Sequence, residues 1–167
     1  MTMDADMILA PNFLSVVVES LLHKPALVLC RISDLPPQAQ IPDNTDELLH
    51  SFDQFLATTQ LRPRYGTGGI QAAARSFFFD IRGYDEGLKW WGAMDGDVVN
   101  RARLKGLAID WIEDRHAMLH QFHPRKHEVL LRPEQIQAAK KAWRLNHALV
   151  KARRLKVKRN PVAWGTA

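Results

Sequence analysis

Apolar residues recur along this chain in two arrangements. Spacings of three and four residues indicate helices, and short continuous runs indicate buried strands. Phe13–His23 shows the first arrangement and Ala26–Ile32 the second. The predicted helices are 13–23, one capped at Asn44 or Thr45, 70–81, 98–105, 113–122, and a long terminal helix with Pro133 in its first turn. The predicted strands are 26–32, 88–94, 107–112 and 127–131. Strands alternating with helices predict a mixed α/β (α+β) fold followed by a helical tail.

The terminal helix has two faces. Its apolar positions fall within about 80° of one another on a helical wheel: Ala138, Ala142, Leu145, Leu149 and Ala152. We expect this face to dock on the body while the opposite, basic face stays in water. Residues 153–159 are basic on every side, which predicts that they fray or order only with a partner. The predicted domains are therefore an α/β domain over 1–131 and a basic helix and tail over 132–167.

The charge of the chain is divided unevenly. Residues 124–167 carry 12 Lys or Arg and 2 acids, whereas residues 1–123 carry 11 basic and 16 acidic side chains. Because a basic patch attracts polyanions, the terminal segment predicts nucleic acid, above all DNA, as the partner. A solvated surface helix is the alternative, and an anionic membrane surface ranks below DNA. The predicted DNA-binding residues are Lys140, Lys141, Arg144, Lys151, Arg153, Arg154, Lys156, Lys158 and Arg159.

Composition narrows the class of protein. The 167 residues are 46% hydrophobic, which is ample for a core, and the single cysteine, Cys30, lies in an apolar run that predicts a buried thiol. The longest apolar run, Phe13–Leu22, contains Glu19 and is too short to span a bilayer. The acidic first residues lack the basic region of a signal peptide. We therefore expect a cytoplasmic protein without membrane insertion.

The segment Met94–Ile112 offers a candidate site for phosphate chemistry. A glycine turn at Asp95-Gly96-Asp97 precedes a short helix, whose first backbone N–H groups can seat a phosphate. Asp95 and Asp97 are candidate Mg²⁺ ligands, and Arg101 and Arg103 are candidate partners for phosphate oxygens. These four residues are the predicted catalytic set. The alternative is an ordinary capped turn with surface arginines.

A second glycine-rich segment could complete this site. Gly66-Thr67-Gly68-Gly69 lies close in sequence to Arg62 and Arg64, although it lacks the Gly-Lys-Ser/Thr ending of a P-loop. The predicted nucleotide- or phosphate-binding residues are Gly96, Arg62, Arg64, Gly68 and Gly69. A flexible loop before a helix is the competing interpretation.

Four histidines suggest a metal site. At the helical spacing i, i+4, i+7, His116, His120 and His123 would share one face, with His127 beyond them. Pro124 interrupts that helix, and no cysteine or closely spaced carboxylate completes a ligand set. Polar surface histidines are therefore favoured over a metal site.

The segment Met94–Ile112, together with the opening strand and turn Leu27–Leu35 and the helix Thr45–Leu56, resembles the ParB/sulfiredoxin superfamily. The resemblance covers Ala26–Ile112 and is most similar to plasmid fertility-inhibition (Osa-like) factors. It implies a DNA-acting inhibitor of conjugative transfer with ATPase and DNase activity, ATP and Mg²⁺ as cofactors, and a component of the transfer apparatus as partner. Where that family has phosphate-binding arginines, this chain has Val98 and Val99. A non-catalytic DNA- or protein-binding regulator on the same fold is therefore the alternative.

Overall fold

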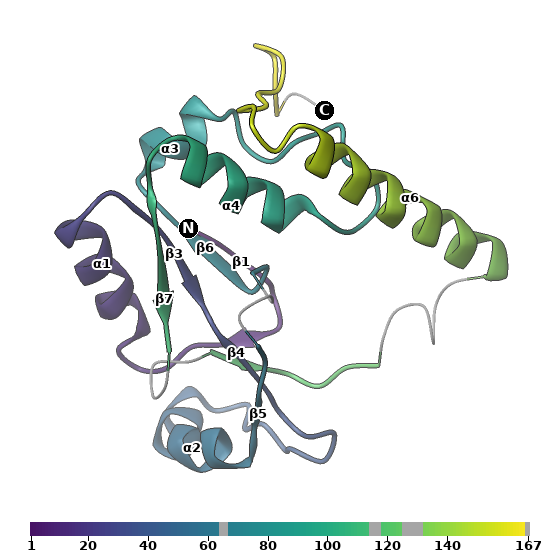
Figure 1. Ribbon diagram of the computed structural model, residues 1–167. Helices are drawn as coiled ribbons and strands as arrows, with labels where there is room; N and C mark the ends of the chain where they lie inside the picture. Colours follow the sequence, from purple (N-terminus) through teal and green to yellow (C-terminus); the bar gives the residue numbers. More distant parts are fainter. Residues whose placement is uncertain (64–66, 114–117, 125–131, 166–167) are drawn as a thin grey trace. The chain divides into compact units, whose positions relative to one another are not determined.

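The computed structural model describes residues 1–63, 67–113, 118–124 and 132–165 (Figure 1). The chain forms two compact units, each built from separate stretches of sequence. The first unit contains Met1–Ala72 and Asp110–His123, and the second contains Ala73–Ile109 and Pro124–Ala167. Helices and sheets occur together, which confirms the mixed α/β class. The predicted domain boundary between residues 131 and 132 stays a prediction.

Two four-stranded sheets organise the strands. One has the order β1 (Thr2–Met3), β6 (Ile70–Ala72), β3 (Ala26–Cys30) and β7 (Ala108–Ile112). The other has the order β2 (Met7–Ile8), β8 (Met118–His120), β4 (Ile32–Asp34) and β5 (Gln60–Leu61). The predicted strand 26–32 is thus divided between β3 and β4, which belong to different sheets. In β3 every residue is buried, as expected for a continuous apolar run.

Two helices of the first unit begin where local signals predict, and α1 also ends there, whereas α2 runs two residues past the predicted end at Leu56. The helix α1 (Phe13–His23) matches its predicted range and packs against β3 through its buried Phe13 and Val17. The helix α2 (Thr45–Thr58) is capped by Asn44, whose Oδ1 accepts hydrogen bonds from the backbone N–H groups of Asp46 (2.8 Å) and Glu47 (3.4 Å). Both predictions are confirmed, because capping and chain termination act between residues close in sequence.

Three predicted elements are wrong because tertiary pairing overrides local periodicity. Residues 70–81 form β6 and then α3 (Arg75–Asp80), since β6 pairs with both β1 and β3. Within 113–122, the described part forms the strand β8, which pairs with β2 and β4. Residues 88–93 are not a strand, and Trp90, Gly92 and Ala93 have positive φ angles that a β ladder does not accommodate. The predicted strand 127–131 lies outside the described residues.

In the second unit, α4 (Met94–Leu104) begins four residues earlier than predicted. The sequence Asp95-Gly96-Asp97 is therefore the first turn of a helix rather than a preceding loop. Val98 and Ala102 are fully buried at the centre of this helix.

Among the described residues, no helix has the length and apolar character needed to cross a membrane. The thiol of Cys30 is buried, and burial raises its pKa to about 12.

The long helix α6 (Pro133–Ala152) starts with the predicted proline but packs through a different face. Leu145 and Leu149, expected to dock, are 54% and 48% exposed. The buried residue is Asn146, whose Nδ2 donates to the carbonyls of Lys89 (2.8 Å), Trp91 (3.3 Å) and Gly92 (3.2 Å). Its Oδ1 accepts from the Lys89 N–H at 3.3 Å. Satisfying this irregular backbone determines the orientation of the helix.

The residues after α6 are held against the second unit. Asn160 is buried, its Nδ2 donates to the carbonyls of Arg82 (2.7 Å) and Tyr84 (2.5 Å), and its Oδ1 accepts from the Glu86 N–H at 3.1 Å. The ring of Trp164 lies edge-on to Phe79 at a centroid distance of 5.9 Å. The prediction that residues 153–159 order only with a partner is wrong, because side chains and carbonyls of this segment bond within the unit.

We predict that Asn146→Ala destabilises the protein by about 1–3 kcal/mol, because it removes a buried amide that hydrogen-bonds to the backbone of Lys89, Trp91 and Gly92. Urea unfolding followed by tryptophan fluorescence measures the loss. Gln137→Ala, at an exposed position of the same helix, is the control and should change stability by less than about 0.5 kcal/mol. Equal stability of the two variants would contradict the role given to Asn146.

Candidate metal centre

The register of one sheet brings together polar side chains from distant parts of the sequence. The strand β8 lies between β2 and β4, and His120 is paired with Met7 on one side and with Asp34 on the other. Asp6 directly precedes Met7, and its carbonyl accepts a hydrogen bond from the Gln121 N–H at 3.0 Å. Asp6, His120 and Asp34 are therefore neighbours along one end of the sheet.

Asp6, His120 and His123 form a cluster suited to a metal ion. The Oδ2 atom of Asp6 lies 3.5 Å from Nε2 of His120 and 3.1 Å from Nε2 of His123, and one ligand atom from each residue lies within 4.8 Å of the others. Metal–ligand bonds of about 2.1 Å place adjacent ligands about 3.0 Å apart in an octahedron and about 3.4 Å apart in a tetrahedron. The two separations from Asp6 match these values, so its carboxylate and each imidazole are spaced as adjacent ligands of one cation, while the separation of the two histidine nitrogens is bounded only at 4.8 Å.

A further carboxylate lies close to the cluster. Burial raises the pKa of Asp4, and the neighbouring negative charge of Asp6 raises it further, while His120 and Arg62 act in the opposite direction. Two carboxylates that repel one another bind a cation favourably, since the ion relieves the repulsion. The backbone N–H of Asp4 donates to the Gly69 carbonyl at 3.1 Å, which holds the turn between β1 and β2 in place.

The glycine-rich segment has a packing role at Gly69. A Cβ atom there would lie 2.8 Å from Cδ1 of Ile32 and 2.9 Å from Cε of Met118, so the position requires glycine for close packing. Gly68 is partly exposed beside it. Arg64 and Gly66 lie outside the described residues.

Arg62, predicted to bind phosphate, is bound to a carboxylate. Its Nε donates to Oδ2 of Asp34 at 2.6 Å and its Nη2 donates to Oδ1 at 2.5 Å, a bidentate arrangement. The same Nη2 lies 3.1 Å from Nδ1 of His120. Arg62 therefore belongs to the surroundings of the candidate metal centre.

The predicted catalytic pair in α4 forms a buried ion pair. Asp97 and Arg101 have side chains only 2% and 1% exposed, with Oδ2 and Nε 2.8 Å apart. Burial raises the pKa of Asp97 and lowers that of Arg101, and the opposite charge of the partner counteracts both shifts. The Nη1 atom of Arg101 also donates to the carbonyls of Ile81 (3.2 Å), Gly83 (2.8 Å) and Lys158 (3.3 Å). This geometry gives both residues a structural function, and their predicted catalytic role stays a prediction.

The remaining predicted catalytic and phosphate-binding residues are spread over both units. Asp95 is partly buried in the first turn of α4, and Gly96 and Arg103 are exposed on that helix. These residues belong to the second unit, whereas Arg62, Gly68 and Gly69 belong to the first. The phosphate and Mg²⁺ roles assigned to them from sequence stay predictions.

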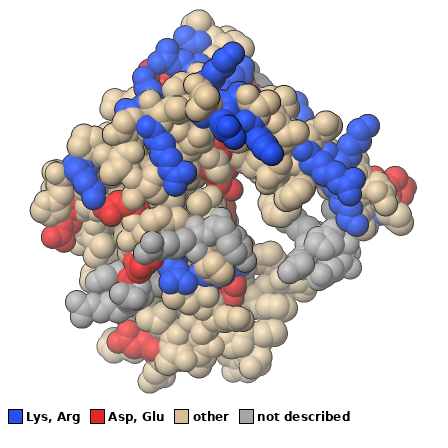
Figure 2. Space-filling view, in the orientation of Figure 1, with Lys and Arg blue, Asp and Glu red and all other residues tan. Residues whose placement is uncertain are grey.

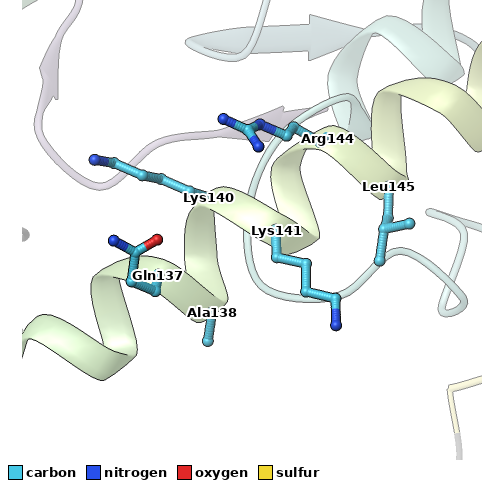
Figure 3. A pocket seen from close by; sticks show the side chains of 6 residues that line it. All are labelled: Gln137, Ala138, Lys140, Lys141, Arg144 and Leu145. Carbon is cyan, nitrogen blue, oxygen red and sulfur yellow. The ribbon is translucent and has the colours of Figure 1, made fainter.

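The nine basic residues predicted to bind DNA fall into three groups of three. Lys140, Lys141 and Arg144 line a hollow of about 500 Å³ along α6 (Figure 3), and the Lys and Arg side chains that extend from the surface are shown in Figure 2. Three others make contacts within the second unit: Arg153 pairs with Asp85, Arg159 pairs with Asp80, and the Lys158 carbonyl accepts from Arg101. Lys151, Arg154 and Lys156 are exposed.

The sequence pointed to His120 and His123 but not to the carboxylate beside them. Their spacing predicted a helix, whereas His120 lies in the strand β8. The carboxylate is that of Asp6, near the start of the sequence. The available signal was Asp4-Ala5-Asp6, two carboxylates between apolar neighbours. His116 and His127 lie outside the described residues.

Comparisons with known proteins place part of this chain near enzymes that transfer galactose-type sugars. A family described as the N-terminal domain of galactosyltransferase matches residues 51–128, slightly less than half of the chain. The protein named "Probable N-acetylgalactosaminyltransferase 9" from Caenorhabditis elegans is 36% identical over 59 residues. That alignment covers 35% of this chain, which spans about one tenth of the relative's length. No solved structure matches.

These comparisons overturn the resemblance to the ParB/sulfiredoxin superfamily. The predicted inhibitor of conjugative DNA transfer, with its ATPase and DNase activities, is contradicted, and the DNA- or protein-binding regulator on that fold is not supported either. ATP as cofactor, and DNA and a transfer apparatus as partners, are likewise wrong. The error has a physical cause, because an α/β pattern with a glycine turn before a basic helix occurs on many folds.

We predict that Asp97→Asn destabilises the protein by about 3–5 kcal/mol, because it leaves the buried charge of Arg101 without its counterion. Chemical unfolding at neutral pH measures the change. Asp95→Asn, the same substitution in the same helical turn, is the matched control and should cost less than about 1 kcal/mol. A loss at Asp97 no larger than at Asp95 would refute the structural function of the buried pair.

Proposed function

We propose that this chain carries the divalent-cation site of a glycosyltransferase that moves a galactose or N-acetylgalactosamine unit from a nucleoside diphosphate sugar to an acceptor hydroxyl. One observation carries the proposal: Asp6, His120 and His123 converge at ligand separations, and both histidines lie inside the segment that matches the galactosyltransferase family. The names of the matched family and relative support the sugar class.

The reaction explains why a cation site is needed. In glycosyl transfer the bond from the anomeric carbon to the diphosphate breaks, a bond from that carbon to the acceptor oxygen forms, and the proton of the acceptor hydroxyl passes to a base or to solvent. A bound divalent cation would neutralise the negative charge of the leaving diphosphate. Asp6, His120 and His123 would supply three of its ligands. Asp4 adds negative charge that favours the cation.

The donor atoms determine which cation is expected. Mg²⁺ prefers oxygen ligands alone, whereas imidazole nitrogen favours transition metals. One carboxylate with two imidazoles therefore favours Mn²⁺ over Mg²⁺ in the same buffer. Both imidazoles must be neutral to coordinate, so protons compete with the cation.

We predict that the protein binds Mn²⁺ and that Asp6→Asn and His120→Gln each weaken binding at least about tenfold, because each removes a ligand. Isothermal titration with MnCl₂ measures the affinity, which should be lower at pH 5.5 than at pH 7.5. His23→Gln replaces an exposed histidine that faces Glu19, and it is the control expected to bind like the wild type. Equal affinity in all four proteins would rule out this cation site.

A second prediction concerns the sugar donor. Binding of UDP-galactose, used as the probe, should require Mn²⁺ and should be lost in Asp6→Asn, because the cation links the protein to the diphosphate. Titration of UDP-galactose with MnCl₂ or with EDTA measures this dependence, and UDP-N-acetylgalactosamine tests the second sugar. Mn²⁺ binding by Asp6 and the histidines without any effect on either nucleotide sugar would separate the metal site from the proposed reaction.

A further inference from the structure

We propose that Asp34, held by Arg62, is a positioning residue that fixes the tautomer of His120, so that Nε2 presents its lone pair to the cation. The link to the cation rests on the proposed function. The tautomer itself follows from contacts among the chain's own side chains, and it can be tested on protein without metal.

The two ring nitrogens of His120 face different carboxylates. Asp34 is paired with His120 across the parallel strands β4 and β8, and its Oδ1 lies 2.9 Å from Nδ1 of the imidazole. On the other side of the ring, Nε2 lies 3.5 Å from Oδ2 of Asp6. The ring thus lies between a carboxylate of the metal cluster and a carboxylate outside it.

The ionised carboxylate of Asp34 determines which ring nitrogen of His120 carries the hydrogen. Both oxygens of Asp34 accept hydrogen bonds from Arg62, at 2.6 Å and 2.5 Å, which is the bidentate geometry of an ionised carboxylate paired with a guanidinium. An ionised carboxylate only accepts hydrogen bonds, so Nδ1 must donate to it. A neutral imidazole has a single N–H, which leaves Nε2 as the coordinating atom.

Two groups compete for Nδ1 of His120. Oδ1 of Asp34, at 2.9 Å, needs an Nδ1–H, whereas Nη2 of Arg62, at 3.1 Å, is a donor and needs an unprotonated Nδ1. In the opposite tautomer Nδ1 would accept from Arg62, and an Nε2–H would point at Asp6. A proton on Nε2 would prevent that atom from coordinating the cation. It would also remove the hydrogen bond from Nδ1 to Asp34, which at 2.9 Å is shorter than the 3.1 Å contact with Arg62.

The backbone N–H and carbonyl of Arg62 are themselves held by hydrogen bonds. Its N–H donates to the Ile32 carbonyl at 2.8 Å, and its carbonyl accepts from Nε (3.0 Å) and Nη2 (2.8 Å) of Arg31. The support therefore runs from Arg31 through Arg62 and Asp34 to His120. A guanidinium can hold both carboxylate oxygens at once, whereas a lysine ammonium at position 62 cannot reproduce that fork.

The first experiment compares Mn²⁺ affinities of full-length variants that retain the far-UV circular dichroism of the wild type. Asp34→Asn should weaken binding about 10- to 100-fold, as expected for loss of a carboxylate behind a metal-binding histidine. Arg62→Lys should weaken it less. Asp110→Asn is the matched control, because Asp110 also pairs with a cation, Lys24, in the first unit but makes no contact with His120 that the structure describes. Wild-type affinity in Asp34→Asn would overturn the proposal.

The second experiment reads the tautomer directly. Long-range ¹H–¹⁵N correlation spectra of the metal-free protein at pH 8, with the His120 signals identified by their loss in His120→Gln, should show the proton on Nδ1. In Asp34→Asn the population should shift toward Nε2–H. A wild-type proton on Nε2, or a tautomer unchanged in the variant, would refute the positioning role. If the wild type shows the Nδ1–H form but binds no Mn²⁺, the proposed function fails while the tautomer assignment stands.

Discussion

The candidate site depends on one constraint, the pairing of β8 with strands on both of its edges. The pairing with β2 places His120 beside the residue that follows Asp6, and the pairing with β4 places it opposite Asp34. Because backbone ladders define the register, both nitrogens of one imidazole meet carboxylates from separate parts of the chain. A shift by one residue would turn His120 to the other face of the sheet and separate these groups. Precise ligand positions require such rigid support.

The second unit adds buried polar contacts to an apolar core that includes Ile81, Val98 and Ala102. Asn146 and Asn160 satisfy the backbone of irregular segments, and the ion pair of Asp97 and Arg101 lies in the interior. Buried polar groups of this kind are costly unless their partners are present, so they favour one arrangement of the chain over its alternatives. Ion pairs also hold the basic tail, because Arg153 pairs with Asp85 and Arg159 pairs with Asp80 within the unit. Net charge counted along the sequence therefore overstates the charge available to a polyanion.

The sequence predicted Mg²⁺ and phosphate at the glycine turn of α4, and that assignment of residues stays a prediction. The structure brings Asp6, His120 and His123 together elsewhere, with one ligand atom of each within 4.8 Å of the others. The predicted ATPase and DNase activities are contradicted by the similarity of part of the chain to sugar transferases. Carboxylates and arginines in a sequence do not distinguish these reactions, because transfer from a nucleotide sugar and hydrolysis of ATP both require neutralisation of a diphosphate.

The sequence by itself determined the mixed α/β class, the range of α1, a cap of α2 at Asn44 or Thr45 and the proline at the start of α6. Each depends on residues within one or two turns of each other, so adjacent side chains carry the whole signal. Only the tertiary structure decided that residues 70–72 and 118–120 are strands, that α6 packs through Asn146, and that Asp6 meets His120 and His123. These outcomes arise from hydrogen bonds and charge contacts between residues far apart in sequence, which local periodicity does not encode.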